Sequence, residues 1–370
     1  MTPAITLSIY VSRLFAIAVA LMLLSLTGLV SLFDFIELLR RSASRPEATF
    51  GLVSEIGALR LPFIAMQILP FAVLLGGILC FWRLTRSSEL IVARAAGVSA
   101  WEFLMAPTLV ALLFGIIATA VVSPVSSVML ARAESIENSY LRSGGGPLAL
   151  NGGQLWMRQS DRALVPQGVA IIHANGVKVQ GRRLSAQDVS VFRLDGNDRL
   201  LSRIEASGAT LANGAWQFDN ARTLRPDQLP DAPGKMTLST DLTVSRVQES
   251  FASPDTLSVW ALPDFIALLD RSGFSSIRHR LHFQSLLALP LLAATMTLMG
   301  AGFSMRPARR GGVARMIGSG VAAGFSLFVI SKMAEEFGQS GALPVVLAAW
   351  APTAAGLMLS ITLLLHTEDG

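Results

Sequence analysis

Cysteine and lysine are scarce in this chain of 370 residues, and each scarcity excludes a class of site. The single cysteine, Cys80, lies in an apolar run, so the chain has neither a disulfide framework nor a zinc site built from cysteines. The lysines are Lys178, Lys235 and Lys332, and none completes a G-x-x-x-x-G-K-[ST] loop. The chain is therefore not expected to hydrolyse a nucleotide through such a loop.

Charged residues are also few. They make up 15% of the sequence, whereas 52% of the residues are hydrophobic and the mean hydropathy is +0.54. A soluble protein of this size carries more charge, so the composition predicts several membrane spans. The net charge of +5 comes mainly from arginines at the ends of apolar runs. This placement fits the positive-inside rule, and secondarily anionic lipid, better than nucleic acid.

Apolar runs long enough to cross a bilayer lie in two groups, three before a polar region and three after it. The first is longer than the apolar core of a signal peptide, and no small-residue cleavage site follows it, so we expect a retained span. The runs cover residues 14–33, 61–82, 103–124, 283–305, 316–331 and 343–365.

Two arginine-rich loops indicate the orientation of the spans. One contains Arg83, Arg86 and Arg94 after the second run, and the other is segment 306–315, RPARRGGVAR, after the fourth. The positive-inside rule places both loops in the cytoplasm. The polar region between the third and fourth runs then lies on the side opposite the amino terminus.

The polar region alternates apolar and polar residues with period two. Alternation is visible in segments 154–158, 188–193 and 237–244, and around Val169 and Val177. Many short strands separated by turn signals predict an antiparallel β domain, either a sandwich or a roll. The turn signals are Gly144-Gly145-Gly146, Asn151-Gly152-Gly153, Asn175-Gly176, Asp195-Gly196, Asn213-Gly214 and Pro233-Gly234.

The expected organisation is three transmembrane helices in residues 1–132, an all-β domain in 133–265, and three helices in 266–370. Segment 87–97 lies between the second and third spans and is amphipathic. Ser87 or Ser88 is expected to cap a short helix, with Glu89 in its first turn and Gly97 at its end. It is either a tight cytoplasmic turn or a helix that docks into a separate motor protein.

Several titratable residues have competing interpretations. His279 and His282 are spaced i, i+3, but no carboxylate or third histidine is close in sequence, so a structural role at the membrane interface is favoured over a metal site. Lys332, Glu335 and Glu336 end the fifth run and are interpreted as a solvated rim. The centres of the spans hold no Asp, Glu or His, which argues against an intramembrane protease.

Arg40 and Arg41 follow the first run by about two helical turns. A guanidinium group pairs bidentately with phosphate, so the two arginines are a candidate phosphate site. The alternative is an interfacial anchor paired in part with Glu37 through helical spacing. Sequence alone leaves both interpretations open.

Segment 88–97, SELIVARAAG, is similar to the S-E-L-x-x-x-x-A-S/A-G coupling helix of a known family. Over its full length the chain resembles the permease subunits of the lipopolysaccharide transport system, and the region around Phe33-Asp34 and Arg40-Arg41 is more similar to the G-type than to the F-type. Ser31 or an apolar neighbour stands where G-type permeases have a basic residue. Further similar pieces are Gly152-Gly153-Gln154-Leu155-Trp156, Pro290-Leu291-Leu292 with Met296, Leu298 and Met299, and the glycine pattern from Gly312 to Gly324.

The resemblance implies a multi-pass permease of the bacterial inner membrane with an inserted periplasmic jellyroll. It implies a heterodimer of this chain with an F-type permease over two copies of an ATPase. That ATPase would bind ATP and magnesium. This chain is therefore expected not to be an enzyme and not to hold a cofactor. Lipopolysaccharide would pass to membrane-anchored and soluble periplasmic bridge proteins of similar fold, with no role for nucleic acid.

The resemblance also implies site residues. The implied ATPase-coupling residues are Glu89, Leu90, Arg94 and Gly97, the implied phosphate ligands are Arg40 and Arg41, and the implied cavity residues are Phe33, Phe325 and Phe328. Alternative functions are a signalling or mechanotransmission protein driven by an ATPase without lipid transport, a membrane-anchored structural β domain, and the F-type partner of the same system.

Overall fold

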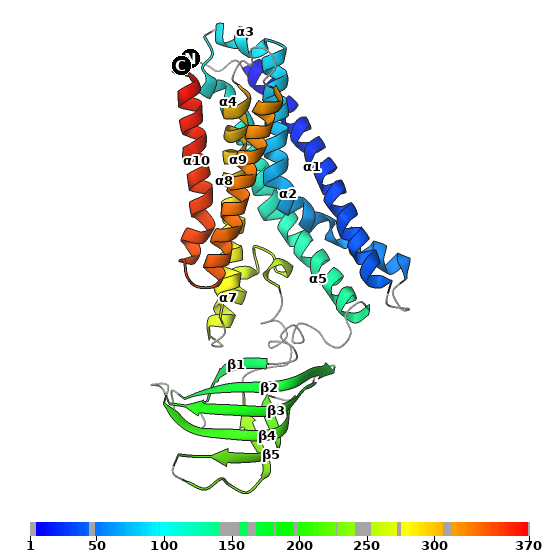
Figure 1. Cartoon of the computed structure of the whole chain (residues 1–370), viewed down its shortest axis with the longest axis vertical. Coiled ribbons are helices and arrows are strands. Elements are labelled where there is room, and N and C mark those ends of the chain that lie inside the picture. Colours follow the sequence, from blue (N-terminus) through cyan, green and yellow to red (C-terminus); the bar gives the residue numbers. More distant parts are fainter. Residues whose placement is uncertain are drawn as a thin grey trace. The chain divides into compact units, whose positions relative to one another are not determined.

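The chain forms two compact units, one of helices and one built around a β-sheet (Figure 1). The helical unit comprises Met1–Ala133, Pro254–Pro263 and Ile277–Gly370, and the β unit comprises Glu134–Ser253 and Asp264–Ser276. The computed structural model describes residues 5–43, 49–95, 97–140, 155–161, 168–180, 183–195, 199–212, 214–226, 228–240, 253–271, 275–305 and 313–368.

Six helical segments in the described ranges are long and apolar enough to span a membrane, as the hydropathy predicted. The third combines α4, a short π-helix η1, and α5. Short elements are α3 (Glu89–Ala95), the 3-10 turn η3 (Pro254–Thr256) and α7 (Leu262–Arg271). The helices that make up the six spans, with the π-helix η1 (Ala118–Val122) inside the third, are α1 (Ile5–Ser42), α2 (Phe50–Arg86), α4 (Ala100–Ile117), α5 (Ser123–Tyr140), α8 (Ile277–Ser304), α9 (Val313–Gln339) and α10 (Val345–Glu368).

The first two helices extend well beyond the apolar runs that predicted them. Asp34 of α1 and Arg60 of α2 lie within these helices and form an ion pair of 2.9 Å, with both side chains at least two-thirds buried. Pairing neutralises the two charges, so the helices continue through a region whose composition is that of a loop. The basic segment 306–312, predicted as a cytoplasmic loop, lies outside the described residues.

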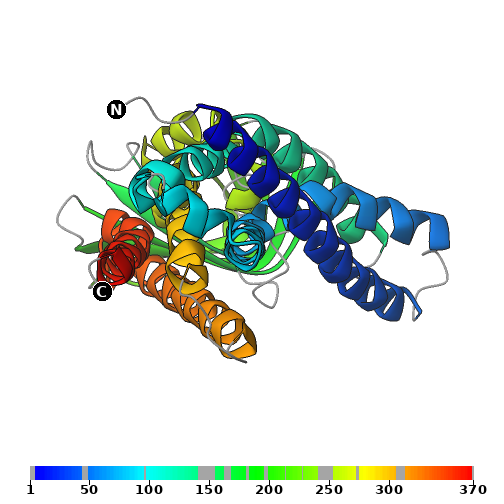
Figure 2. The ribbon, with the colours of Figure 1, turned by 90° about the horizontal axis from the view of Figure 1, so that it is seen from above.

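The helices of the central core approach one another through glycine. A Cβ on Gly76 of α2 would lie 2.7 Å from the Cα of Val19, and one on Gly115 of α4 would lie 2.4 Å from the Cα of Pro290 in α8. Small residues allow this backbone contact, on which helix packing in membranes depends. Seen from above, α9 and α10, orange and red, lie to one side of the core and α1, blue, to the other (Figure 2).

The β unit contains one antiparallel sheet of six strands in sequence order, which confirms the predicted antiparallel β domain. Strands β4 and β5 were not recognised as alternating runs, because small residues such as Ala206, Gly208 and Ala209 hide the alternation. Segments 141–154 and 241–252, with two of the predicted turn signals, lie outside the described residues. The strands are β1 (Leu155–Ser160), β2 (Val169–Gln180), β3 (Arg183–Leu194), β4 (Leu200–Ala212), β5 (Ala215–Leu224) and β6 (Gly234–Ser239).

The prediction of a turn at Asn175-Gly176 is wrong, because β2 continues through both residues. The pairing of β2 with β3 shifts register on either side of Asn175, and Gly176 has φ +56°. The two residues therefore form a β-bulge, which uses the same left-handed glycine conformation as a hairpin turn. A local turn signal does not distinguish a bulge from a chain reversal.

We expect Gly115→Ala to lower the melting temperature of the purified protein in detergent, because the added Cβ meets the Pro290 backbone. Overpacking of this kind costs about 1–3 kcal/mol. Gly28→Ala is the matched control, since no atom lies within 4 Å of its Cβ position. Equal melting temperatures for the two variants would contradict the role assigned to this contact.

Candidate functional site

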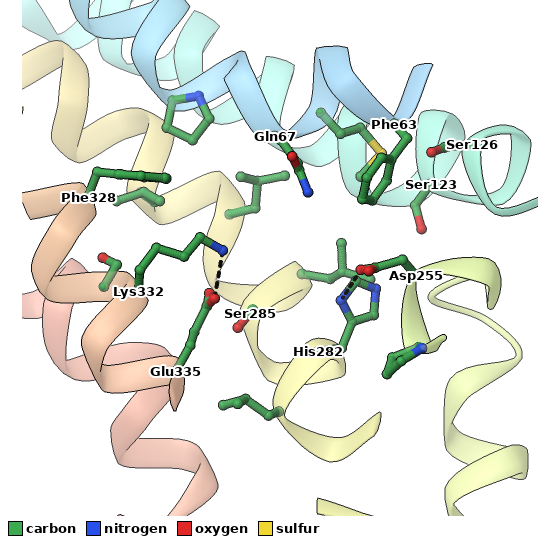
Figure 3. Close-up of a pocket in the computed structure, with 18 of the residues that line it drawn as sticks. Phe63, Gln67, Ser123, Ser126, Asp255, His282, Ser285, Phe328, Lys332 and Glu335 are labelled. Carbon is green, nitrogen blue, oxygen red and sulfur yellow. Dashed lines mark hydrogen bonds and ion pairs between the residues drawn. The ribbon is translucent and has the colours of Figure 1, made fainter. Parts of the chain in front are cut away.

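A cavity of about 490 Å³ lies inside the helical unit, among α2, α5, α8 and α9 (Figure 3). Residues of the segment that precedes α7, Pro254 and Asp255, complete its wall. Cavities of this size accommodate small ligands or part of a larger one. We take it as the candidate functional site.

The cavity has a polar end and an apolar end. Along α8 the wall changes from Arg278, His282 and Ser285 to Leu289 and Met296 as the chain proceeds. One end therefore offers charges and hydrogen-bonding groups, and the other offers hydrocarbon. This gradient matches an amphiphile, whose head and chain need opposite surroundings.

One ion pair and one contact between a histidine and a carboxylate line the polar end and are drawn as dashed lines in Figure 3. Lys332 Nζ lies 2.7 Å from Glu335 Oε2 on α9, and His282 Nδ1 lies 3.2 Å from Asp255 Oδ1. Lys332 and Glu335 were interpreted as a solvated rim, but both line the cavity. Asp255 was missed, because its pairing with His282 joins residues far apart in the chain.

Aromatic and aliphatic side chains close the apolar end. Phe71 of α2 and Phe328 of α9 form an edge-to-face pair with ring centroids 5.0 Å apart. Lys332 Nζ lies 5.8 Å from the centroid of the Phe328 ring, so Phe328 lies where the polar and apolar ends meet. Gln67 also lines the cavity and was missed, although a polar residue within an apolar run is a recognisable signal.

The structure places the three predicted cavity phenylalanines differently. Phe328 lines the described cavity, whereas Phe33 of α1 and Phe325 of α9 are 64% and 57% exposed on the helical unit. Phe33 and Phe325 belong to the least buried spans. Of the residues in the most apolar stretch of each span, 11% are buried in the first span and 17% in the fifth. In α8 the buried share is 72%.

Arg40 and Arg41 lie in the last turn of α1 and do not line the cavity. Both donate hydrogen bonds to the Glu37 carboxylate, from Arg40 Nε and Nη2 and from Arg41 Nε, each at 2.8 Å. This is the pairing that the anchor interpretation required. The two guanidinium groups nevertheless remain exposed and present positive charge at the helix end.

Helix α3 is fixed to the core on one face and exposed on the other. Leu90 and Ala93 are buried, whereas Val92 is 68% exposed. Ser88 and Gly97, with φ of +62° and +85°, bound the helix on either side. The side chain of Arg94 and all of Ala96 lie outside the described residues.

Two serines were predicted as alternative caps of α3, and the structure excludes only Ser87. Ser88 directly precedes the helix, and its carbonyl accepts a hydrogen bond from the Val92 amide at 3.1 Å. Ser87 is the C-cap residue of α2, and its hydroxyl donates to the Arg83 carbonyl at 3.0 Å and to Glu89 Oε1 at 2.8 Å. The serine therefore orients Glu89 through its side chain. A full capping box lies at the next helix, where Ser99 and Glu102 begin α4.

Comparison with known proteins finds similarity over almost the whole chain. The family model for the lipopolysaccharide export system permease LptF/LptG matches residues 9–366. The chain belongs to this family. It is 25% identical to the lipopolysaccharide export system permease protein LptG of Escherichia coli strain K12 over 378 residues, which cover 99% of both chains. It is 21% identical to LptG of Haemophilus influenzae over 369 residues, covering 98% of this chain and 99% of that protein.

Membership in the LptF/LptG family indicates in which half of the membrane the cavity lies. The chain is a multi-pass permease of the inner membrane with a periplasmic β domain. Helix α8 therefore begins at the periplasmic face, and the polar end of the cavity lies in the periplasmic half of the membrane. Helix α3 lies between the second and third spans, on the cytoplasmic side. Within the described ranges, no group of three His, Cys, Asp or Glu residues is arranged to hold a metal.

Proposed function

We propose that this chain is the G-type permease of an ABC transporter that extracts lipopolysaccharide from the outer leaflet of the inner membrane. The observation that carries the proposal is the amphipathic cavity in the periplasmic half of the helical unit. A lipid of that leaflet has its head at the polar end and its chains at the apolar end. A signalling protein without lipid transport has no need of such a cavity.

A single permease encloses only part of the substrate. A cavity of about 490 Å³ is small for a lipid with several acyl chains. The weakly buried faces of α1 and α9 leave apolar surface for a second permease. We propose that an F-type partner packs there, and that Phe33 and Phe325 line the larger cavity of the heterodimer.

The energy for extraction comes from a separate ATPase, present in two copies, that binds ATP and magnesium. The absence of a P-loop in this sequence supports the proposal. Helix α3 offers the docking surface, because Val92 is exposed while Leu90 and Ala93 hold the helix to the core. Glu89 is oriented by Ser87 at the start of this surface, and Gly97 ends it.

The β domain receives the extracted lipid and passes it to membrane-anchored and soluble periplasmic bridge proteins. Within the described part of the sheet, β1 and β6 each pair with one neighbouring strand, so each has an edge open to another strand. The sheet also has a buried apolar face that includes Ile172, Val191 and Trp216. An apolar face of a sheet suits the acyl chains of a lipid.

A photoreactive benzophenone amino acid tests the cavity assignment directly. We expect it to crosslink lipopolysaccharide from position 328, and also from 33 and 325 in the complex with the F-type partner. Position 81 is the control, because Phe81 is 1% exposed in the packed core. Crosslinking from position 81 at the rate seen from 328 would disprove the lipid assignment.

The docking surface predicts a selective effect of charge at position 92. Val92→Asp is expected to reduce co-purification of the ATPase and lipopolysaccharide-stimulated ATP hydrolysis, because a carboxylate replaces an exposed apolar contact. Val92→Leu keeps the apolar surface and is expected to retain both. Normal association of the Val92→Asp variant with the ATPase would place the motor contact elsewhere.

Binding of two lipids, one phosphorylated and one dephosphorylated, distinguishes the phosphate hypothesis for Arg40 and Arg41 from the anchor interpretation. If the arginines leave Glu37 for a lipid phosphate, the double Arg→Ala variant loses affinity for phosphorylated lipid. Loss of one charge-assisted contact weakens binding by about ten- to a hundredfold. Binding of a dephosphorylated lipid is expected to change little. An equal loss for both lipids would support the anchor.

A further inference from the structure

The segment Ser253–Ala261, which we call the strap, crosses the polar end of the cavity. It connects the chain of the β domain to α7 and belongs, from Pro254 onward, to the helical unit. Pro254 and Asp255 line the cavity. The strap begins with the 3-10 turn η3, closed by a hydrogen bond from the Leu257 amide to the Pro254 carbonyl at 3.1 Å.

The first fastening of the strap is to α8. Asp255 Oδ1 lies 3.2 Å from Nδ1 of His282, and both side chains face the cavity (Figure 3). The two side chains are 36% and 23% exposed. Both side chains are thus partly accessible to solvent, so the contact can open without unfolding of the core.

The second fastening is to the third span, at the π-helix η1. Trp260 Nε1 donates to the Ala120 carbonyl at 3.1 Å, and the Val259 amide donates to Ser123 Oγ at 3.3 Å. The ring of Trp260 is itself 69% exposed. A π-helical turn is uncommon and is found frequently at functional sites.

The π-helix is in turn tied to α8. Thr119 Oγ1 donates to the Leu286 carbonyl at 2.9 Å, and Leu286 lines the cavity. The strap thus runs from one cavity wall, at His282, to a second wall, at Ser123. Among the described contacts, three residues of the strap, Asp255, Val259 and Trp260, meet three residues of the walls, which are His282, Ser123 and Ala120.

The strap also places a negative charge at the polar end. The charged and titratable groups that line this end are Arg278, His282, Lys332, Glu335 and Asp255. Asp255 neutralises His282 when that histidine is protonated, and Glu335 neutralises Lys332. An anionic lipid head that enters this end therefore competes with the Asp255 carboxylate of the strap for His282.

We propose that the strap is a latch that closes the periplasmic end of the cavity and opens when an anionic lipid head displaces Asp255. The latch rests on the proposed function of the cavity as a lipid site. It gives the strap a role in the departure of lipid, because the strap is covalently continuous with the chain of the β domain.

The test is the rate at which a water-soluble maleimide labels a cysteine in the cavity. The reporter is Ser285→Cys in a Cys80→Ser background, in the full permease and ATPase complex in lipid nanodiscs without lipopolysaccharide. Asp255→Asn and Trp260→Phe, singly and together, are expected to raise the labelling rate several-fold. Glu336→Gln, at a position outside the cavity wall, is the matched control and is expected to leave the rate unchanged. An unchanged or slower rate in the double variant would overturn the latch.

Two further measurements separate the outcomes. In chains that keep Cys80, which is 2% exposed in the core, the strap substitutions must leave Cys80 unlabelled, so that faster labelling at position 285 reports the latch and not unfolding. Addition of lipopolysaccharide is expected to slow labelling at position 285 in the double variant. Failure of this protection alone would contradict the lipid site and the displacement of Asp255 by lipid, and would leave only the closure of the cavity by the strap, which is measured without lipid.

Discussion

The close packing of α8 against its neighbours is the constraint on which the rest of the helical unit depends. Gly115 accepts the Pro290 backbone, and Gly300 approaches the backbone of α2 at Leu74 and Ile78. From Ala293 to Ser304 almost every residue of α8 is buried. Among the described residues, this part of α8 is closely packed against its neighbours, and the cavity of the candidate site lies in the periplasmic half.

Charge within the membrane helices follows a second rule, which is pairing. Asp34 with Arg60, Lys332 with Glu335, and Asp255 with His282 each bring opposite or complementary groups within 3.2 Å. The first pair joins α1 to α2 and allows both helices to continue beyond the apolar runs. The other two pairs line the cavity. Pairing therefore occurs both between packed helices and at the wall of the cavity.

In helix α3, the fold decides which side chains are buried and which are exposed. The predicted segment 87–97 is longer than α3, but its stop at Gly97 was readable, because helix termination depends on local backbone conformation. Which of its apolar side chains stay exposed was not readable, since five of the seven residues of α3 are apolar. Burial of Leu90 and Ala93 in the core decides the matter and leaves Val92 on the outside.

The sequence by itself determined the six spans, their grouping and the antiparallel β domain, because hydropathy and period-two alternation are local properties of the chain. It also located the short helix between the second and third spans. The tertiary structure alone decided that Lys332 and Glu335 face a cavity, that Asn175-Gly176 is a bulge, and that Asp255 and Trp260 fasten a strap across two cavity walls. Each of these depends on contacts between segments far apart in the chain, and the free energy of such contacts is set by the packing of the whole unit and not by the neighbours of a residue in the sequence.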